Sequence, residues 1–366
     1  MVVHFHEILF YVLIGAHIFL LAPVVWKVIT YSMPSPSGIQ PRVTVIVCAH
    51  NEAHHLPHLI PALLAQKYLQ LEIILVLDRC TDASQKIVST FSDPRLQTIA
   101  IEEVPHGIHP KKHGISQAIH KAAGEWVLLT DADCLPASDE WVNSFAIHMH
   151  KDVELILGAG AYYHNGTAIG ALTGYETFQT AIHYFAAALS GNAYMGVGRN
   201  IAYKKEAFLA SKGFAPHENV LGGDDDLLVQ KLSTPSNTVV NFGHQSLTYS
   251  YPKRTLKGYL KQKTRHFSVG KHYQPQIKRN HMIRMSLHAL VWLSWLYLIC
   301  IFPAPERIIV LFGLLVLVKG LFFKKIAYKT GLPFQLRWFL LLDFCYAILL
   351  PLIGIRARFE RTTRWK

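Results

Sequence analysis

The sequence predicts an α/β protein with an open, mostly parallel sheet, helices on both faces, and transmembrane helices at both ends of the chain. Strand-like and helix-like segments alternate between residues 42 and about 252, as they do in βαβ units. Uncharged stretches long enough to cross a bilayer occur near both termini. Only 16% of the 366 residues are charged, which is fewer than in most soluble enzymes and indicates a membrane protein.

The first element is the apolar stretch Ile8–Trp26, which has no formal charge over nineteen residues. No basic residue precedes it, so a cleaved signal peptide is not expected. Lys27 and Arg42 follow it, and the positive-inside rule then places the amino terminus outside and the large domain in the cytoplasm. The Pro- and Ser-rich residues that come next are expected to be a linker.

The soluble part of the chain shows β-branched apolar runs separated by helix-like stretches. The expected elements are strand Arg42–Cys48, a helix ending at Gln66, strands Leu71–Leu77 and Leu96–Ile101, helix Ile115–Ala123 and strand Trp126–Thr130. Ligands bind at the carboxyl ends of the strands in such sheets. The polar residues that end or follow three of these strands are therefore candidate site residues: His50-Asn51-Glu52, Asp78 and Asp131-Ala132-Asp133.

Three further apolar stretches near the carboxyl end are candidate spans: Met285–Pro305, Ile308–Phe323 and Trp338–Ile355. Lys319 interrupts the second stretch, and Asp343 lies within the third. Basic residues follow both of these stretches, and the positive-inside rule favours the cytoplasm for both basic groups. A single full crossing between the two groups would put one of them outside. The last stretch is therefore expected to be re-entrant or interfacial, and the number of carboxyl-terminal spans stays open between two and three.

These segments divide the chain into an amino-terminal anchor, a linker, a catalytic domain, a basic interface segment, carboxyl-terminal membrane helices and a basic tail. Their expected boundaries are residues 1–30, 31–41, 42–252, 253–284, 285–356 and 357–366. The net charge is +12, and Lys253–Arg284 holds ten basic and no acidic residues. Such a segment just before an apolar stretch favours anionic lipid over nucleic acid as a partner.

Asp131 and Asp133 follow an apolar strand and lie two residues apart, so in an extended chain their side chains leave on the same side. They can offer carboxylate oxygens to one Mg²⁺ or Mn²⁺, which would stabilise a departing nucleoside diphosphate. The alternative is a turn in which Asp forms local hydrogen bonds.

A second acidic cluster contains Asp224, Asp225 and Asp226. Three adjacent carboxylates repel one another, and one of them could be a general base with a raised pKa. The start of a helix explains part of this cluster, because acidic residues favour the amino-terminal end of the helix dipole.

Gln262, Arg265 and His266 share one face of a predicted helix, and Arg265 could bind a diphosphate. A basic amphipathic helix on the membrane surface is the alternative, and the two interpretations are compatible.

The glycines around Arg199 would allow close approach to a ligand or form a tight turn. Lys111, Lys112 and Gly114 precede a helix and could contact phosphate or form an exposed loop.

Taken together, these motifs resemble those of family 2 glycosyltransferases with the GT-A fold, over roughly residues 42 to 270. The matching segments are Val43–Glu52, Leu75–Asp82, Lys112–Ala118, Leu128–Asp133, Gly222–Leu227 and Gln262–His266. The resemblance implies a UDP- or GDP-linked sugar donor and inversion at the anomeric carbon. Together with the predicted orientation of the anchor, it favours transfer at the cytoplasmic face of a cell or inner membrane to a lipid-linked or glycan acceptor: a lipid-linked sugar, a polyprenyl phosphate or a growing glycan.

The resemblance also implies roles for individual residues. Asp131 and Asp133 would hold the metal, and Asp224 matches the catalytic base, with Asp225 as the alternative. Arg199, Gln262 and His266 would lie near the acceptor or the diphosphate. The residues expected to bind the nucleotide sugar are Ala49, Asn51, Glu52, Asp78, Lys112, Gly114, Asp131 and Arg265.

Other activities fit the sequence less well. His266 stands where the processive synthases of the family have Trp, which weighs against long-chain polymerisation, although a processive synthase remains an alternative. A sugar nucleotidyltransferase would need a glycine-rich loop after the first strand, and Ala49–Glu52 has no glycine. A degenerate, non-catalytic membrane binding protein would be expected to have lost its acidic motifs, and both are intact here.

Overall fold

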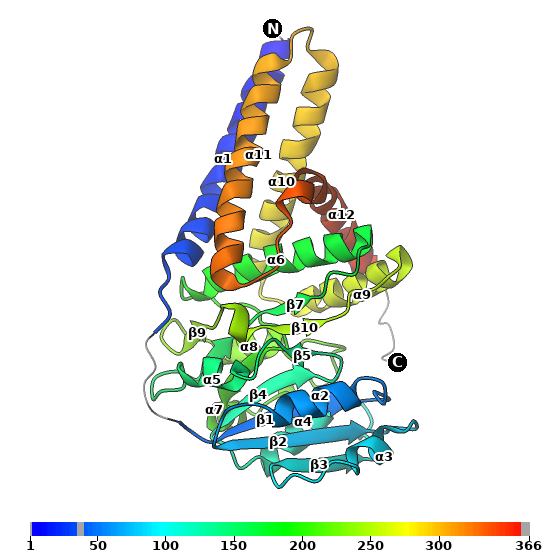
Figure 1. Ribbon diagram of the computed structural model, residues 1–366. Coiled ribbons are helices and arrows are strands. Elements are labelled where there is room, and N and C mark those ends of the chain that lie inside the picture. The colour runs from blue at the N-terminus through cyan, green and yellow to red at the C-terminus, as the bar shows by residue number, and fades with distance from the viewer. Residues whose placement is uncertain (1, 35–39, 360–366) are drawn as a thin grey trace.

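The computed structural model describes residues 2–34 and 40–359 (Figure 1). It confirms an α/β domain built on a seven-stranded, mostly parallel sheet with the order β3-β2-β1-β4-β8-β6-β9. These strands are β1 Val43–Ala49, β2 Leu71–Asp78, β3 Leu96–Ile101, β4 Trp126–Asp131, β6 Leu155–Leu157, β8 Ile201–Lys204 and β9 Thr238–Val240. Strand β8 runs antiparallel to both of its neighbours, and the remaining pairs are parallel.

A second, three-stranded sheet lies between the main sheet and the apolar helices (Figure 1). Its order is β5-β10-β7, with β10 antiparallel to β5 and parallel to β7. The strands are β5 Leu135–Pro136, β7 Gly160–Tyr162 and β10 Thr248–Ser250. Because β5 begins four residues after β4 ends, this small sheet starts directly beside the carboxyl end of β4.

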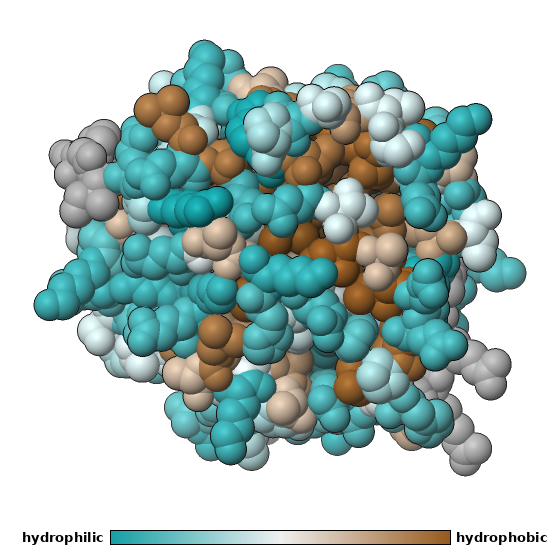
Figure 2. All heavy atoms as spheres, turned by 90° about the horizontal axis from the view of Figure 1, so that it is seen from below, coloured by the Kyte–Doolittle hydropathy of each residue, from teal (hydrophilic) through white to brown (hydrophobic). Residues whose placement is uncertain are grey.

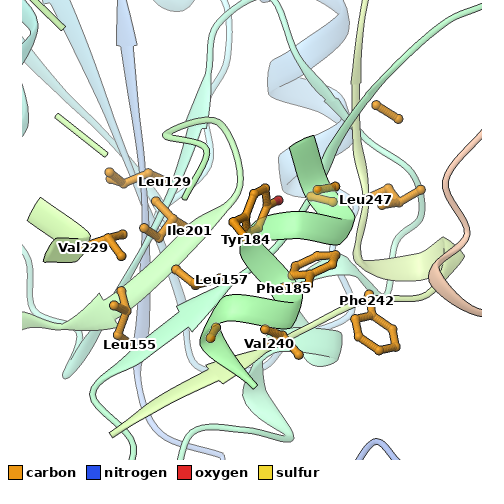
Figure 3. Packing of buried hydrophobic residues seen from close by; sticks show 14 of the residues in the cluster. Leu129, Leu155, Leu157, Tyr184, Phe185, Ile201, Val229, Val240, Phe242 and Leu247 are labelled. Atoms are coloured by element: carbon orange, nitrogen blue, oxygen red, sulfur yellow. The ribbon is translucent and has the colours of Figure 1, made fainter. Parts of the chain in front are cut away.

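Alternating side chains of the central strands pack on helices at the two faces of the main sheet. In β1, Val45 and Val47 belong to one apolar core with helices α2 and α5, whereas Ile46 belongs to a second core with α4 and α6. Tyr184 and Phe185 of α6 pack over the strands of this second core (Figure 3). The helices of the catalytic domain are α2 Leu56–Leu64, α3 Ser84–Val88, α4 Pro110–Lys121, α5 Trp141–Ala146, α6 Ala168–Ala188, α7 Lys205–Ala210, α8 Asp226–Leu232 and α9 Leu256–Val269.

Helices α1 Val2–Thr30, α10 Pro275–Ile301 and α11 Glu306–Thr330 run side by side away from the catalytic domain (Figure 1). Among the described residues, three helical segments are long and apolar enough to cross a membrane: Phe5–Thr30, Pro275–Ile301 and Leu336–Phe359. The opposite end of the molecule, seen in Figure 2, is mostly hydrophilic, with apolar side chains recessed between polar ones. This distribution is compatible with a membrane protein.

Helix α12, Phe339–Phe359, contacts the catalytic domain near both of its ends. Phe339 packs against Tyr175 of α6 with ring centroids 6.0 Å apart, and Gly354 faces the side chain of Phe267 in α9. Its length and composition would allow it to cross a membrane.

The first turns of α10 lie within the predicted basic segment 253–284. The helix begins at Pro275, includes Lys278 and Arg284, and continues without a break into the apolar stretch from Met285. The boundary at residue 284 stays a prediction. Pro275 has the fixed φ and missing N–H that suit the first helical position, and no helix breaker follows it. The predicted tail from residue 360 onward and residues 35–39 of the linker lie outside the described residues.

A buried polar cluster joins the apolar helices to the catalytic domain. Asp343 of α12 accepts hydrogen bonds from Lys319 of α11, at 2.7 and 2.9 Å, and from Trp292 of α10 at 3.1 Å. The hydroxyl of Tyr175 in α6 donates to the same carboxylate at 2.5 Å. His288 Nε2 lies 3.1 Å from Asp343 Oδ2. A single carboxylate therefore fixes three apolar helices against α6.

The residue after Tyr175 makes a second buried connection. Glu176 of α6 forms an ion pair with Lys263 of α9 at 2.8 Å and accepts a hydrogen bond from Tyr259 at 2.9 Å. All three side chains are buried. Helix α6 thus holds α9, which carries several of the predicted site residues, in a fixed position.

Candidate active site

The ends of β1, β2 and β4 bring the predicted site residues to one edge of the main sheet. Ala49 pairs with Leu77, and Cys48 pairs with Asp131, in parallel register. Asp78 and Asp131 are therefore the last residues of β2 and β4, the two strands that flank β1, and they lie at the same edge of the sheet. This is the edge at which ligands bind in open α/β sheets.

The loops after β1 and β2 are tied together by predicted nucleotide-pocket residues. Asn51 has a positive φ of 57°, and its Oδ1 accepts hydrogen bonds from the backbone N–H groups of Thr81 and Asp82 at 2.8 and 3.2 Å. The backbone N–H of Glu52 donates to Ser84 Oγ at 3.0 Å. Asn51 and Glu52 thus shape the rim of the edge next to Asp78.

Asp78 is buried at the end of β2 and forms a two-point ion pair with Arg79. Nε and Nη2 of Arg79 donate to the two carboxylate oxygens at 2.7 and 3.1 Å. Arg79 is also in the left-handed region, with φ 47°, which turns its side chain back onto the preceding residue. A ligand that hydrogen-bonds to the Asp78 carboxylate must share it with Arg79.

Lys111 lies at the centre of the site. Its Nζ is 2.9 Å from Asp131 Oδ1 and 2.8 Å from Asp224 Oδ2. Burial alone would lower the pKa of Lys111, but the two carboxylates hold it well above its usual value. One ammonium group therefore brings the Asp131 triplet and the second acidic cluster, 93 residues apart in sequence, to a single point.

Lys112, which the sequence suggested as a ligand-binding residue, points elsewhere. Its Nζ is buried and donates to the carbonyl oxygens of His217 and Val220 at 2.6 and 3.0 Å. Burial lowers its pKa to about 8. Gly114 lies against β2, where an added Cβ would be 3.1 Å from the Val76 side chain. Within the described residues, the lysine that contacts the two acidic groups is therefore Lys111, and the ligand-binding roles of Lys112 and Gly114 stay predictions.

Asp131, Asp133 and Cys134 form a group whose potential ligand atoms lie within 4.8 Å of one another. Burial raises the pKa of the Cys134 thiol well above its usual value, and thiolate is the ligand type that Zn²⁺ and Cu⁺ prefer over Mg²⁺ and Mn²⁺. The two carboxylates remain as ligands, and their oxygens are the atom type that Mg²⁺ and Mn²⁺ prefer. The group fits the metal site expected from the sequence.

The three adjacent aspartates have different environments. Burial would raise the pKa of Asp224, but Lys111 lowers it to about 2. Burial and the Asp224 charge raise the pKa of Asp225 to about 6. Asp225 also caps α8, because its two oxygens accept from the N–H groups of Asp226 and Gly198, each at 2.8 Å. Asp226 is buried and accepts a hydrogen bond from Tyr273.

Asp225 is expected to make the stability of the protein depend on pH. The pKa of Asp225 is about 6 in the folded protein, against an ordinary value of 3.8. Between pH 3.8 and pH 6, the folded protein therefore holds a proton on this carboxylate that the unfolded chain has lost. Stability contributed by this group is lost as the pH rises through 6. We expect the free energy of unfolding of the wild type to fall by roughly 1 to 3 kcal/mol between about pH 4 and pH 8 because of this group, and that of Asp225→Asn to fall by less, because the amide does not ionise. Thermal unfolding of both proteins at the two pH values measures this, and an equal fall in the two proteins would contradict it.

Arg199 lies beneath the small sheet. Its guanidinium donates to Ser250 Oγ at 3.0 Å and to the Gly160 carbonyl at 2.9 Å, and it stacks on Tyr162 at 4.4 Å. These contacts join β7 and β10 to the loop before β8. The neighbouring Gly198 leaves little space, because an added Cβ would be 3.2 Å from Asp224 Oδ2.

Helix α9 carries Gln262, Arg265 and His266, and its last residue, Val269, packs on Gly222 and Gly223 just before the second acidic cluster. Gln262 Oε1 is buried and has no hydrogen-bond partner within residues 40–359. The structure agrees with the prediction that these three residues lie on one helix, and their roles stay predictions.

Comparison with protein families gives a direct result. The model of glycosyltransferase-like family 2 matches residues 41–268, more than half of the chain. The chain belongs to this family. The match begins at β1 and ends in α9, so it contains Lys111 and both acidic clusters, and it confirms the resemblance inferred from the motifs.

Similar proteins include the succinoglycan biosynthesis protein ExoO of Rhizobium meliloti, which is 31% identical over 93 residues, 25% of this chain and 26% of ExoO. The glycosyltransferase GlyG of Streptococcus pneumoniae is 28% identical over 139 residues, 37% of this chain and 44% of GlyG. The chain therefore covers less than half the length of these relatives.

A solved structure resembles almost the whole chain. The mannosyltransferase PcManGT from Pyrobaculum calidifontis, in complex with GDP-Man and Mn²⁺, has a TM-score of 0.62 and 18% identity. The similarity covers 96% of this chain and 99% of PcManGT. At this identity the likeness shows the fold, including the GT-A architecture predicted from the motifs.

Proposed function

We propose that the protein is an inverting glycosyltransferase that moves a sugar from a UDP- or GDP-linked donor to a lipid-linked or glycan acceptor at the cytoplasmic face of a membrane. The observation that carries the proposal is the contact of Lys111 with both Asp131 and Asp224. In this proposal the contact joins the residues that would hold a metal ion, bind the diphosphate and serve as the base. The GDP-Man and Mn²⁺ bound by PcManGT support the same assignment.

The donor would lie along the edge of the main sheet, with its nucleoside near Asp78 and its diphosphate near Asp131. Asp131 and Asp133 would hold Mg²⁺ or Mn²⁺, which when bound neutralises charge on the leaving diphosphate. Lys111 can move from Asp131 to a phosphate oxygen without leaving the site, because its ammonium group already lies at the edge of the sheet.

Asp224 is the candidate base. Its carboxylate would take the proton from the acceptor hydroxyl while that oxygen attacks the anomeric carbon and the nucleoside diphosphate leaves. Asp225 has a pKa closer to neutrality, which favours a general base. However, both of its oxygens are engaged by backbone N–H groups, whereas Asp224 faces Lys111 and the diphosphate side. The geometry therefore favours Asp224.

The arrangement of the apolar helices supports a cytoplasmic catalytic domain. Lys27 at the end of α1, Arg284 near the start of α10 and Lys329 at the end of α11 all lie at the ends nearest the catalytic domain. The positive-inside rule places these ends in the cytoplasm. Because both ends of α12 also contact the catalytic domain, its basic last turn stays on the same side.

A donor screen tests the function. Purified full-length protein is incubated with UDP- and GDP-sugars, Mn²⁺ or Mg²⁺ and a membrane extract, and released nucleoside diphosphate and new glycosides are measured by mass spectrometry. At least one donor should be consumed, and EDTA should stop the reaction. Asp131→Ala should lower turnover at least a hundredfold. Full activity of this variant would show that the metal assignment is wrong, and turnover of no donor would reject the function.

A further inference from the structure

Three tyrosine rings lie in contact at the small sheet, with Tyr163 stacked on Tyr249 and tilted against Tyr251; they are called the stack below. The ring centroids of Tyr163 and Tyr249 are 5.0 Å apart, and those of Tyr163 and Tyr251 are 4.9 Å apart. Tyr249 and Tyr251 flank the buried Ser250 in β10, so their side chains leave on the same side of the strand. Tyr163 and Tyr249 are partly buried, whereas Tyr251 is 67% exposed.

The stack lies at the end of the small sheet that adjoins the candidate metal site. Leu135 of β5 pairs antiparallel with Tyr249 of β10. Moving two residues back from Leu135 reaches Asp133, and moving two residues forward from Tyr249 reaches Tyr251. The antiparallel order therefore places Asp133 and Tyr251 at the same end of this pair of strands. The backbone N–H of Tyr163 donates to the Ser250 carbonyl at 3.0 Å, which holds the third ring there as well.

The chemistry of this surface suits a sugar ring. One face of a pyranose carries C–H groups, which are attracted to the electron-rich face of an aromatic ring, and stacking also removes apolar surface from water. The chain neighbours His164, Lys253 and Arg254 are exposed and polar. They can hydrogen-bond to sugar hydroxyls, whereas a lipid chain would need a continuous apolar surface at this point.

The position of the stack favours the acceptor over the donor. Strand order runs from β2, where the nucleoside would lie near Asp78, through β1 to β4, where the metal triplet lies. The small sheet begins beyond β4, on the far side of the diphosphate from the nucleoside. A ring stacked on Tyr251 would thus approach the anomeric carbon from the side opposite the nucleotide.

We propose that the acceptor carries a sugar ring and that this ring stacks on the Tyr163–Tyr249–Tyr251 surface, with Tyr251 as the outer contact. The proposal rests on the proposed transferase function and narrows its acceptor class to saccharides, free or lipid-linked. A polyprenyl phosphate without a sugar would make no use of the stack. Because the contact is made in both the ground state and the transition state, its loss should raise KM for the acceptor more than it lowers kcat.

The test uses full-length protein, a donor identified in the screen, and two kinds of acceptor: octyl glycosides of common hexoses and N-acetylhexosamines, and farnesyl phosphate. Wild type should glycosylate at least one octyl glycoside. Tyr251→Ala should raise KM for that glycoside at least tenfold, and Tyr251→Phe should stay within twofold of wild type. Donor hydrolysis without acceptor should be unchanged in both variants.

Leu69→Ala is the matched control, because it also removes an exposed apolar side chain, in the turn before β2 and far from the small sheet in sequence. It should leave acceptor kinetics unchanged. The proposal is overturned if Tyr251→Ala has wild-type KM for the glycoside, if farnesyl phosphate alone is glycosylated, or if Tyr251→Ala instead raises KM for the donor. Wild-type protein that turns over no donor would reject the transferase function itself.

Discussion

Asp224→Asn is expected to lower the rate of sugar transfer about 10²- to 10⁴-fold, because the amide cannot accept the proton of the acceptor hydroxyl. The substitution keeps the size of the side chain and removes one charge that faces Lys111. Affinity for the nucleoside diphosphate should stay within a fewfold of wild type, because the metal ligands are untouched. Steady-state kinetics with the donor from the screen, together with calorimetric titration of UDP or GDP, measures both quantities.

Two variants make this result interpretable. Asp152→Asn removes an exposed carboxylate in the turn before β6 and should leave the rate unchanged. Asp225→Asn keeps a side chain that can cap α8 and should retain most of the activity. If Asp225→Asn loses activity as severely as predicted for Asp224→Asn, while Asp224→Asn stays active, the base is Asp225.

Asp343→Ala is expected to lower the free energy of unfolding by about 3–5 kcal/mol, because it leaves the buried Lys319 ammonium without its carboxylate. The hydroxyl of Tyr175 and the indole N–H of Trp292 lose their acceptor at the same time. Thermal unfolding of the full-length protein in detergent should show a clear fall in the midpoint.

The double variant Asp343→Leu with Lys319→Met is the control, because it replaces the buried ion pair by apolar side chains of similar volume. It should recover much of the stability lost in Asp343→Ala. A midpoint for Asp343→Ala within one degree of wild type would show that this cluster does not hold the apolar helices on α6.

The parallel half of the fold follows closely from sequence pattern. Strands β1, β2, β3 and β4 lie within one or two residues of their predicted positions, because each is an apolar, β-branched run bounded by turn residues. Helix α4 starts five residues earlier than expected, at Pro110, which is favoured at the first helical position. The short strands β6 to β10 have three or four residues each, too few for a periodic pattern to mark them.

Helix α6 shows why tertiary contacts were harder to predict. It is buried on most of its surface, so its apolar residues do not form a single stripe. Nothing in the local sequence indicates that Tyr175 and Glu176, neighbours in the chain, contact Asp343 and Lys263 on different elements. Pairing between distant charged groups depends on the packing of whole helices.

The geometry of the candidate site follows only in part from sequence pattern. Asp131 and Asp133 end and follow an apolar strand, where site residues are expected, whereas the contact of Asp131 and Asp224 with one lysine joins segments that are distant in sequence. Lys111 and Lys112 are neighbours in α4, and adjacent helical residues point about 100° apart. One lysine therefore enters the site while the other is buried under the loop at His217.

The central claim, that Asp131 and Asp133 hold a metal ion which binds the donor diphosphate, is tested most directly by calorimetric titration of UDP and GDP with and without Mn²⁺. Wild-type protein should bind at least one nucleotide, at least tenfold more tightly with Mn²⁺ than with EDTA. Asp131→Asn and Asp133→Asn should each lose this metal-dependent increase. Equal affinity with and without the metal, or an unchanged increase in both variants, would contradict the claim.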